Sequence, residues 1–177
     1  MSIYTISIVP KQLVYHGDRF AKSKEIVQWL IDENVIDSAV RADSAWGEYQ
    51  YRSGILKYCQ PSPWCHPNRG GYGMSVITEK TVFDRLGFDK ATCSHCGFSM
   101  NEYVFYKIVG SWWENAGEVP CPGCAKGLSI MDVIVEPAWG FSDLGFTFWE
   151  APDFTQEFYA KFEKRLESKL WIVYCRL

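Results

Sequence analysis

Cys93-Ser94-His95-Cys96-Gly97 and Cys121-Pro122-Gly123-Cys124 are two close cysteine pairs in the middle of this 177-residue chain. Each C-x-x-C can fold as a tight turn that directs two thiolates to a common centre, and two such turns complete a tetrahedral shell of sulfur. Gly97 and Gly123 suit these turns, since glycine adopts positive φ without steric cost. We therefore predict that one structural Zn²⁺ ion is bound by Cys93, Cys96, Cys121 and Cys124.

Four protein ligands leave no open coordination position, so this ion is expected to stabilise the fold and not to activate water. His95 lies between two predicted ligands, where its ring is expected to point away from the ion, and its replacing a cysteine is the less favoured arrangement. A redox dithiol and a set of unrelated buried thiols are the remaining alternatives for these cysteines.

The spacing of the two pairs resembles that of zinc ribbons. The resemblance covers residues 92–126, about a fifth of the chain, and predicts an inserted zinc-ribbon module between two parts of a scaffold, 1–91 and 127–177. Zinc ribbons occur in proteins of many kinds, so the resemblance implies metal binding without implying a particular function.

Composition limits the class of protein. A chain of this length with 47% hydrophobic residues can bury a substantial core. The net charge of −3 and the pI near 5.6 argue against extensive binding to phosphates. The first residues, Met1 to Ile6, lack a basic stretch followed by an apolar run, and no window resembles a membrane span. We expect a cytoplasmic location, where paired cysteines are more often metal ligands than disulfides.

Hydrophobic periodicity predicts the scaffold. Residues 3–9 and 170–177 alternate as strands, and 144–149 form an aromatic strand. A helix is expected over 24–34 with Ser23 as its N-cap. A second helix carries Phe158, Phe162 and Leu166 at a spacing of four residues, preceded by a capping box of Asp153 and Gln156. This order predicts an α+β fold of the ferredoxin-like, split β-α-β kind, with two helices covering one face of an antiparallel sheet.

The connecting segments are less regular. Tyr49 and Tyr51 mark a short strand, 60–73 is a loop rich in proline and glycine, and 78–86 is predicted as a helical turn or short helix. Within and after the metal module, 103–109 and 128–135 are predicted as strands because both are rich in β-branched or aromatic residues.

Catalytic motifs are scarce. The sequence contains no H-E-x-x-H, no G-x-S-x-G and no phosphate-binding glycine loop. Cys59, Cys65 and His66 lie near one another in sequence, and a second metal site or a thiolate–imidazole pair there is less favoured than unrelated roles. A thiol enzyme that uses Cys59 or Cys65, with His66 or His16 nearby, remains an alternative, while Cys175 is expected to be buried in the last strand.

The chain has more large aromatic rings than its core obviously needs: eight Trp, ten Tyr and eleven Phe. Trp112 and Trp113 are adjacent, so on a strand or a turn at least one of them faces outward and offers a contact surface. The segment 98–120 carries Lys107 against three glutamates, which disfavours phosphate. We therefore expect Trp112 and Trp113 to bind a protein partner.

The sequence thus predicts a non-enzymatic zinc-binding protein that binds another protein. Its small, acidic, single-domain format resembles bacterial immunity proteins, which implies an inhibitor of a toxin enzyme. Residues 136–141 and 145–149 resemble a signature that recurs in uncharacterised bacterial proteins, which implies a bacterial source. The alternative is a nucleic-acid-binding zinc ribbon, which requires a basic surface assembled from Arg41, Arg52, Lys57 and Arg69.

Overall fold

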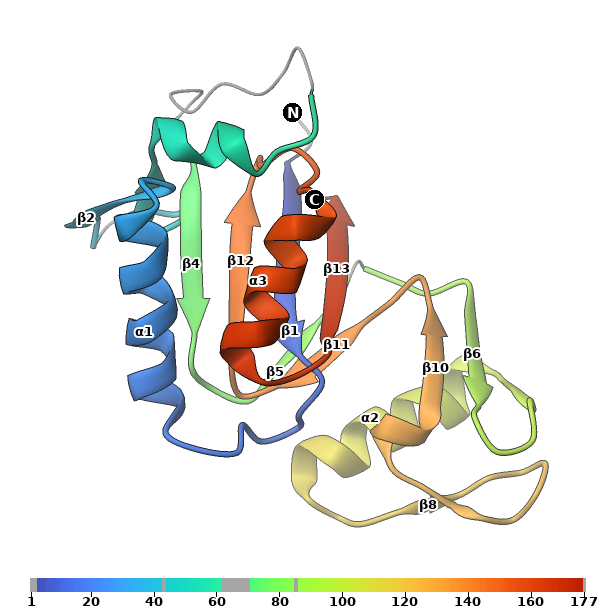
Figure 1. Ribbon diagram of the computed structural model, residues 1–177. Coiled ribbons are helices and arrows are strands. Elements are labelled where there is room, and N and C mark those ends of the chain that lie inside the picture. Colours follow the sequence, from blue (N-terminus) through green and yellow to red (C-terminus); the bar gives the residue numbers. More distant parts are fainter. Residues whose placement is uncertain (1–2, 43, 62–70, 85, 177) are drawn as a thin grey trace. The chain divides into compact units, whose positions relative to one another are not determined.

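The computed structural model describes residues 3–42, 44–61, 71–84 and 86–176. The chain forms two compact units (Figure 1): Met1–Arg85 together with Gly140–Leu177, and Leu86–Trp139. The predicted module, 92–126, lies inside the second unit. The described residues contain three α-helices and antiparallel sheets, which confirms a mixed α+β class.

The first unit is built on a six-stranded antiparallel sheet with the strand order β13-β1-β12-β4-β3-β2. Its strands are β1 (Tyr4–Pro10), β2 (Ile36–Val40), β3 (Tyr49–Tyr51), β4 (Gly73–Ile77), β12 (Gly145–Trp149) and β13 (Leu170–Arg176). The other elements of this unit are α1 (Arg19–Asp32), the 3₁₀ helix η1 (Ser53–Lys57), α3 (Gln156–Leu166), and the ribbon of β5 (Thr81–Phe83) with β11 (Gly140–Ser142).

Strand β1 lies in the interior of the sheet. It pairs with β12 on one side and with β13 on the other, both antiparallel. Ile6 and Ile8 point to one face and Val9 to the other, and all three are buried, so both faces of this strand are covered. The strands predicted at 3–9, 144–149 and 170–177 are confirmed to within a residue or so at each end.

Helices α1 and α3 cover one face of the six-stranded sheet (Figure 1). The core beneath them is largely aromatic: the Trp29 ring of α1 meets Phe162 of α3 edge to face, with 5.2 Å between centroids. Such edge-to-face pairs are favourable beyond the area that they bury. The same cluster contains Tyr51, Tyr58, Phe146, Phe148, Phe154 and Phe158.

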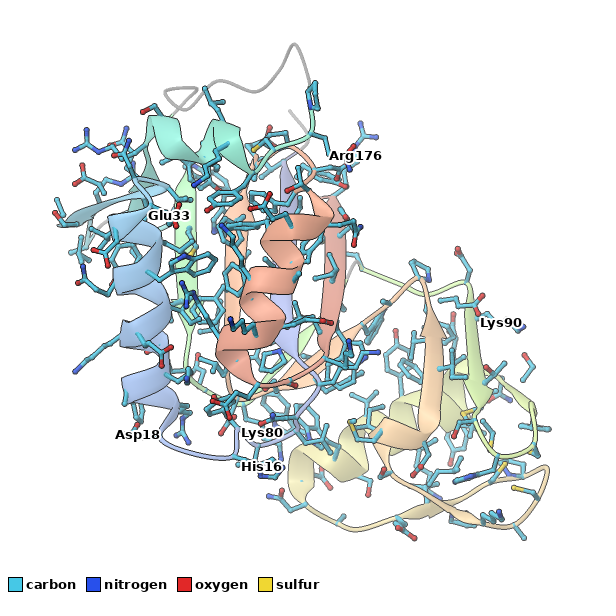
Figure 2. The ribbon with its side chains drawn as sticks, in the orientation of Figure 1. His16, Asp18, Glu33, Lys80, Lys90 and Arg176 are labelled. Carbon is cyan, nitrogen blue, oxygen red and sulfur yellow. The ribbon has the colours of Figure 1, made fainter. Side chains whose placement is uncertain are left out.

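Helix α1 starts earlier than the sequence indicated. Asp18 is the N-cap, and its side chain accepts hydrogen bonds from the backbone N–H groups of Phe20 and Ala21. The predicted cap, Ser23, is instead buried in the first turns and donates its hydroxyl to the carbonyl of Phe20. Figure 2 shows Asp18 at the beginning of the helix and Glu33 at its other end.

Two other predictions in the first unit are wrong. The described residues of this range, 78–84 and 86, form no helix: β5 pairs with β11, because Phe83 packs with Val9 and Val173 in a small second core. The N-cap of α3 is Thr155, so Asp153 and Gln156 make no capping box. The predicted helix carrying Phe158, Phe162 and Leu166 is confirmed as α3, with all three side chains buried.

The second unit has a three-stranded sheet, a short hairpin and one long helix. The sheet has the order β10-β6-β7, formed by β6 (Lys90–Cys93), β7 (Ser99–Met100) and β10 (Val133–Glu136). The hairpin pairs β8 (Val119–Pro120) with β9 (Gly127–Leu128), and the helices are α2 (Glu102–Glu114) and the 3₁₀ helix η2 (Ile130–Asp132). The predicted strand 128–135 is therefore divided among β9, η2 and β10.

The strand predicted at 103–109 is wrong, since these residues belong to α2. Asn101 caps the helix by accepting a hydrogen bond from the backbone N–H of Val104. Phe105 and Ile108 are buried one helical turn apart, and Phe105 meets the Trp139 ring at 5.1 Å between centroids. Aromatic and β-branched residues fit a strand, but the cap and this spacing favour a helix.

Part of the predicted loop 60–73 lies outside the described residues, and the chain is in strand β4 from Gly73 onward. None of the helices in the described ranges has the length and apolar character required to cross a bilayer.

Candidate metal centre

The four cysteines of the two C-x-x-C segments come together in the second unit. The sulfur atoms of Cys93, Cys96, Cys121 and Cys124 all lie within 4.8 Å of one another. The Sγ atoms of Cys96 and Cys121 are 3.8 Å apart. Zn–S bonds of about 2.3 Å at tetrahedral angles require sulfurs about 3.8 Å apart, so the cluster has the size of a four-sulfur metal site.

The first pair of cysteines is held by the turn that joins β6 to β7. The backbone N–H of Gly97 donates to the carbonyl of Cys93 at 2.9 Å, and the N–H of Cys93 donates to the carbonyl of Phe98 at 3.0 Å. Gly97 has φ 72°, the left-handed conformation that was expected of it. The turn therefore fixes both sulfurs of this pair by backbone hydrogen bonds.

The second pair is held by the same hydrogen-bond pattern between β8 and β9. The N–H of Ala125 donates to the carbonyl of Cys121 at 2.9 Å, and the N–H of Cys121 donates to the carbonyl of Lys126 at 2.7 Å. Ala125, with φ 59°, takes the left-handed position that Gly97 has in the first turn. The sequence offered no signal for this, because alanine rarely adopts that conformation.

Gly123 has a different role from the one predicted. Its φ is not in the left-handed region. A Cβ atom at this position would lie 2.7 Å from Cβ of Phe98, so the second turn needs a glycine because the first turn packs directly against it. The N–H of Gly123 also donates to Sγ of Cys121 at 3.4 Å, a contact that favours a thiolate there.

The thiols affect one another strongly. Burial raises the pKa of Cys121, but hydrogen bonds donated by the N–H groups of Cys124 and Gly123 and by neighbouring thiols outweigh it, and the pKa is about 7. At Cys96 the N–H of Phe98 lowers the pKa, but burial and the three other thiols raise it to about 12. Without a metal ion Cys96 therefore keeps its proton at neutral pH, and a cation among the four sulfurs would favour their thiolate forms.

His95 does not join the sulfur cluster. Its Nε2 lies 3.4 Å from Oδ1 of Asp132, whose other oxygen accepts hydrogen bonds from the backbone and hydroxyl of Ser129. Cys93 and Cys121 are buried, whereas Cys96 is exposed. Within the described ranges there is no second group of three or more His, Cys, Asp or Glu side chains at ligand distance.

Two of the other cysteines, Cys59 and Cys175, lie among the described residues of the first unit. Cys59 is buried and forms an isolated bridge with Phe154, while Cys175 is buried in β13 as expected. Cys65 and His66 lie outside the described residues. His16 is exposed near the beginning of α1, and its backbone N–H donates to the side chain of Gln12 (Figure 2).

Three of the four residues proposed for a basic surface are engaged within the protein. The guanidinium of Arg41 donates to the carbonyls of Gly71 and Gly47. Arg52 pairs with Asp37, and Lys57 pairs with Glu33 at 2.7 Å. Arg69 lies outside the described residues. These bonds neutralise or occupy the cations that a nucleic-acid surface would need.

The two predicted contact residues, Trp112 and Trp113, are on helix α2 and not on a strand or turn. Trp113 is 52% exposed and Trp112 is partly buried, and their rings meet edge to face at 5.9 Å. Two further aromatic residues on α2, Tyr103 and Tyr106, are also exposed. Sequence reasoning missed them because it assigned this segment to a strand; the helical spacing of the aromatic residues was the signal.

No protein-family model, no curated protein and no solved structure matches the chain. The chemistry of the site therefore follows from its own geometry. Four sulfurs that converge from two turns, two of them buried, can hold one metal ion.

Proposed function

We propose that Cys93, Cys96, Cys121 and Cys124 hold one Zn²⁺ ion whose role is structural. The observation that carries this proposal is the sulfur–sulfur separation, which fits tetrahedral Zn–S geometry. Iron in a four-sulfur site has a similar geometry, but zinc is the commoner ion for two C-x-x-C turns. With four sulfur ligands the ion has no position for a substrate, so the centre stabilises the unit without catalysing a reaction.

We further propose that the second unit is a zinc ribbon inserted into a split β-α-β scaffold. The strand order β13-β1-β12-β4, with α1 following β1 and α3 following β12, supports the scaffold assignment. Strands β2 and β3 then extend this sheet beyond β4. The two equivalent cysteine turns support the ribbon assignment.

The biochemical role that we propose is binding of a protein partner through α2. Its exposed side carries Tyr103, Tyr106 and Trp113, and rings of this kind are favoured at protein interfaces. Glutamates at both ends of the helix disfavour nucleic acid. A cytoplasmic bacterial inhibitor of the immunity type is the biological class that we propose for this format.

Metal analysis tests the proposal that the four cysteines hold one structural zinc ion. Purified protein is expected to contain one zinc per chain by native mass spectrometry and elemental analysis. Cys93→Ser is expected to lose the metal, whereas the control Cys175→Ser, in a buried cysteine of the other unit, is expected to keep it. Wild-type protein without any transition metal would contradict the assignment.

Partner capture tests the proposal that α2 binds a protein partner. Trp113→Ala is expected to reduce recovery of partners at least tenfold, a typical effect of removing an exposed aromatic anchor. Tyr174→Ala, an exposed aromatic residue on β13, serves as the control. Equal capture by all three proteins would exclude the α2 surface.

A further inference from the structure

The exposed side of α2 has the spacing of a helix-packing surface. Tyr103, Tyr106, Lys107, Gly110, Trp113 and Glu114 recur at intervals of three and four residues, and all but the half-buried Gly110 are exposed. This is the pattern by which one helix packs along another. Helix α2 also buries Phe105 and Ile108 on its opposite side, so it carries large apolar or aromatic side chains on two sides. A helix of that kind is normally covered on both.

Within the described structure of a single chain, no contact explains why position 110 is a glycine. It lies in the middle of the helix, where glycine is less stable than alanine. A Cβ atom added at Gly110 would meet nothing within 4 Å. The glycine therefore leaves a notch on the exposed side of α2, and a notch of this kind allows the backbone of a second helix to approach closely.

The residues around Gly110 are arranged so that the surface complements itself. Tyr106 and Lys107 precede the glycine by four and three residues, and Trp113 and Glu114 follow it by three and four. If a second α2 crosses antiparallel at Gly110, Tyr106 faces Trp113 of the other copy, and Lys107 faces its Glu114. Aromatic rings thus meet aromatic rings, and cations meet anions, twice in each pair. Among the described residues, neither Lys107 nor Glu114 takes part in an ion pair within the chain.

The antiparallel crossing of two α2 helices also gives the ring of Tyr103 a place to bind on the other copy. Tyr103 is 77% exposed and precedes Gly110 by seven residues, so it faces the segment about seven residues after Gly110 in the other copy. A groove of about 440 Å³ extends from Lys107 and Gly110 on α2 to Glu118 and Pro120 beyond the helix, so it includes that segment. A groove of this size accommodates a phenol ring. The spacing along α2 therefore allows Tyr103 of each copy to enter the groove of the other.

We propose that α2 is the interface of a homodimer, in which two copies of this chain pair antiparallel about Gly110. This inference rests on the proposed function, because it names a second copy as the protein partner of the α2 surface. A contact made mainly by one helix of 13 residues is small. We therefore expect a dissociation constant on the order of 10–100 µM.

Charge reversal provides the decisive experiment, with sedimentation velocity as the measurement on metal-loaded, full-length protein. Wild type is expected to dimerise as its concentration rises to about 0.5 mM. Lys107→Glu places Glu opposite Glu114, and Glu114→Lys places Lys opposite Lys107, so each variant alone is expected to dimerise at least about tenfold more weakly. An equimolar mixture of the two variants restores both ion pairs and is expected to form a heterodimer.

Gly110→Ala supplies a second test that does not depend on charge. In the monomer it replaces a helical glycine next to open space, so the thermal midpoint of the second unit is expected to rise by roughly 4 °C. In the dimer the added methyl group fills the notch, so association is expected to weaken. A more stable and more monomeric variant supports the interface, whereas unchanged association overturns it.

The inference and the proposed function fail in different ways. Wild-type protein that stays monomeric at about 0.5 mM overturns the dimer. The dimer is equally overturned by single charge variants that associate as wild type does, or by a mixture that stays monomeric. If the protein is monomeric and still captures other proteins in a manner that depends on Trp113, the proposed function stands and only its assignment to a second copy falls.

Discussion

At the scale of single residues, the two cysteine turns differ in one position. Gly97 and Ala125 occupy equivalent places, with φ 72° and 59°, and the N–H of each donates to the carbonyl of the first cysteine of its turn. An L-residue in this conformation has its Cβ too close to the following carbonyl. The second turn therefore carries backbone strain that the first turn avoids.

Exchanging the two residue types is expected to have opposite effects. Ala125→Gly relieves the strain and is expected to stabilise the metal-loaded protein by about 0.5–1 kcal/mol, after the greater freedom of glycine in the unfolded chain is subtracted. Gly97→Ala is expected to destabilise it by about 1 kcal/mol. Urea unfolding of both variants checks the prediction, and changes of the same sign would contradict it.

At this scale the sequence predicted the four converging cysteines and the conformation of Gly97. It could not predict the role of Gly123, because a side chain there is excluded by Phe98, which is distant in sequence. It could not predict Ala125 either, since nothing in an alanine indicates positive φ. The spacing of the cysteines can be read from a short stretch of sequence. The packing of one turn against the other depends on residues far apart in the chain and cannot be predicted in this way.

At the scale of elements, the predicted strand at 103–109 shows where local propensity misleads. The residues have high β-propensity, but that preference amounts to only about 1 kcal/mol and depends on context. Asn101 and Asn115 cap the two ends of α2, the latter with φ 56°. Each cap contributes a comparable energy, and burial of Phe105 and Ile108 on one side adds more. Together these outweigh the preference for a strand.

Three elements of the first unit are tied together at Glu33, the C-cap of α1. Its Oε2 accepts hydrogen bonds from Nζ of Lys57, at the end of η1, and from the hydroxyl of Tyr58, both at 2.7 Å. Nζ of Lys161, on α3, donates to the same hydroxyl at 2.9 Å. Lys57, and after it Tyr58, lowers the pKa of Glu33 to about 2.

This network predicts a pH-dependent contribution to stability. Because the pKa of Glu33 is lower in the folded state than its ordinary value of 4.5, the stabilisation is present above about pH 4.5 and disappears as the pH falls toward about 2. Glu33→Gln is expected to cost about 1 kcal/mol at neutral pH, since the groups are partly exposed, and close to nothing near pH 2. Urea unfolding over this pH range measures it.

Glu25→Gln is a suitable control, because Glu25 lies on the same helix in an exposed pair with Lys22 and is expected to contribute less. A Glu33→Gln penalty that stays constant from pH 7 to about pH 2 would show that the charge of Glu33 is not responsible.

At the scale of the whole molecule, the two units have separate cores. The core under α1 and α3 belongs to the first unit, whereas Phe105, Ile108, Leu128 and Trp139 are buried in the second. The second unit has only 54 residues, from Leu86 to Trp139, and a domain of that size buries a smaller fraction of its surface than a larger domain does. The stability of the second unit is therefore expected to depend on the metal, whereas the stability of the first unit is expected not to depend on it.

Metal removal tests this division. A chelator is expected to raise amide hydrogen exchange strongly between residues 86 and 139 and to leave exchange in β1, β12 and α3 unchanged. Exchange followed by mass spectrometry measures both regions in one sample. Uniform loss of protection along the chain, or no loss in the second unit, would show that the metal does not serve that unit alone.

At this scale the sequence predicted the class, the two helices of the first unit and three of its longer strands, because these have long, regular periodicity. The short strand marked by Tyr49 and Tyr51 is also confirmed, as β3. The ribbon of β5 and β11 was not predictable in the same way. Each strand has three residues, and they lie far apart in the chain, so no periodic pattern specifies their pairing. These two short strands can be recognised only when the core around Val9 and Phe83 is known.

The pairing of β1 has a consequence for biosynthesis. This strand is made before the second unit, but both of its neighbours, β12 and β13, are made after it. On the ribosome, the cysteine-bearing unit therefore emerges complete and can acquire its ion while β1 still waits for its partners. The first unit therefore completes its sheet after the second unit has been made, and the open edges of β1 must be kept from wrong pairing until β12 and β13 have been made.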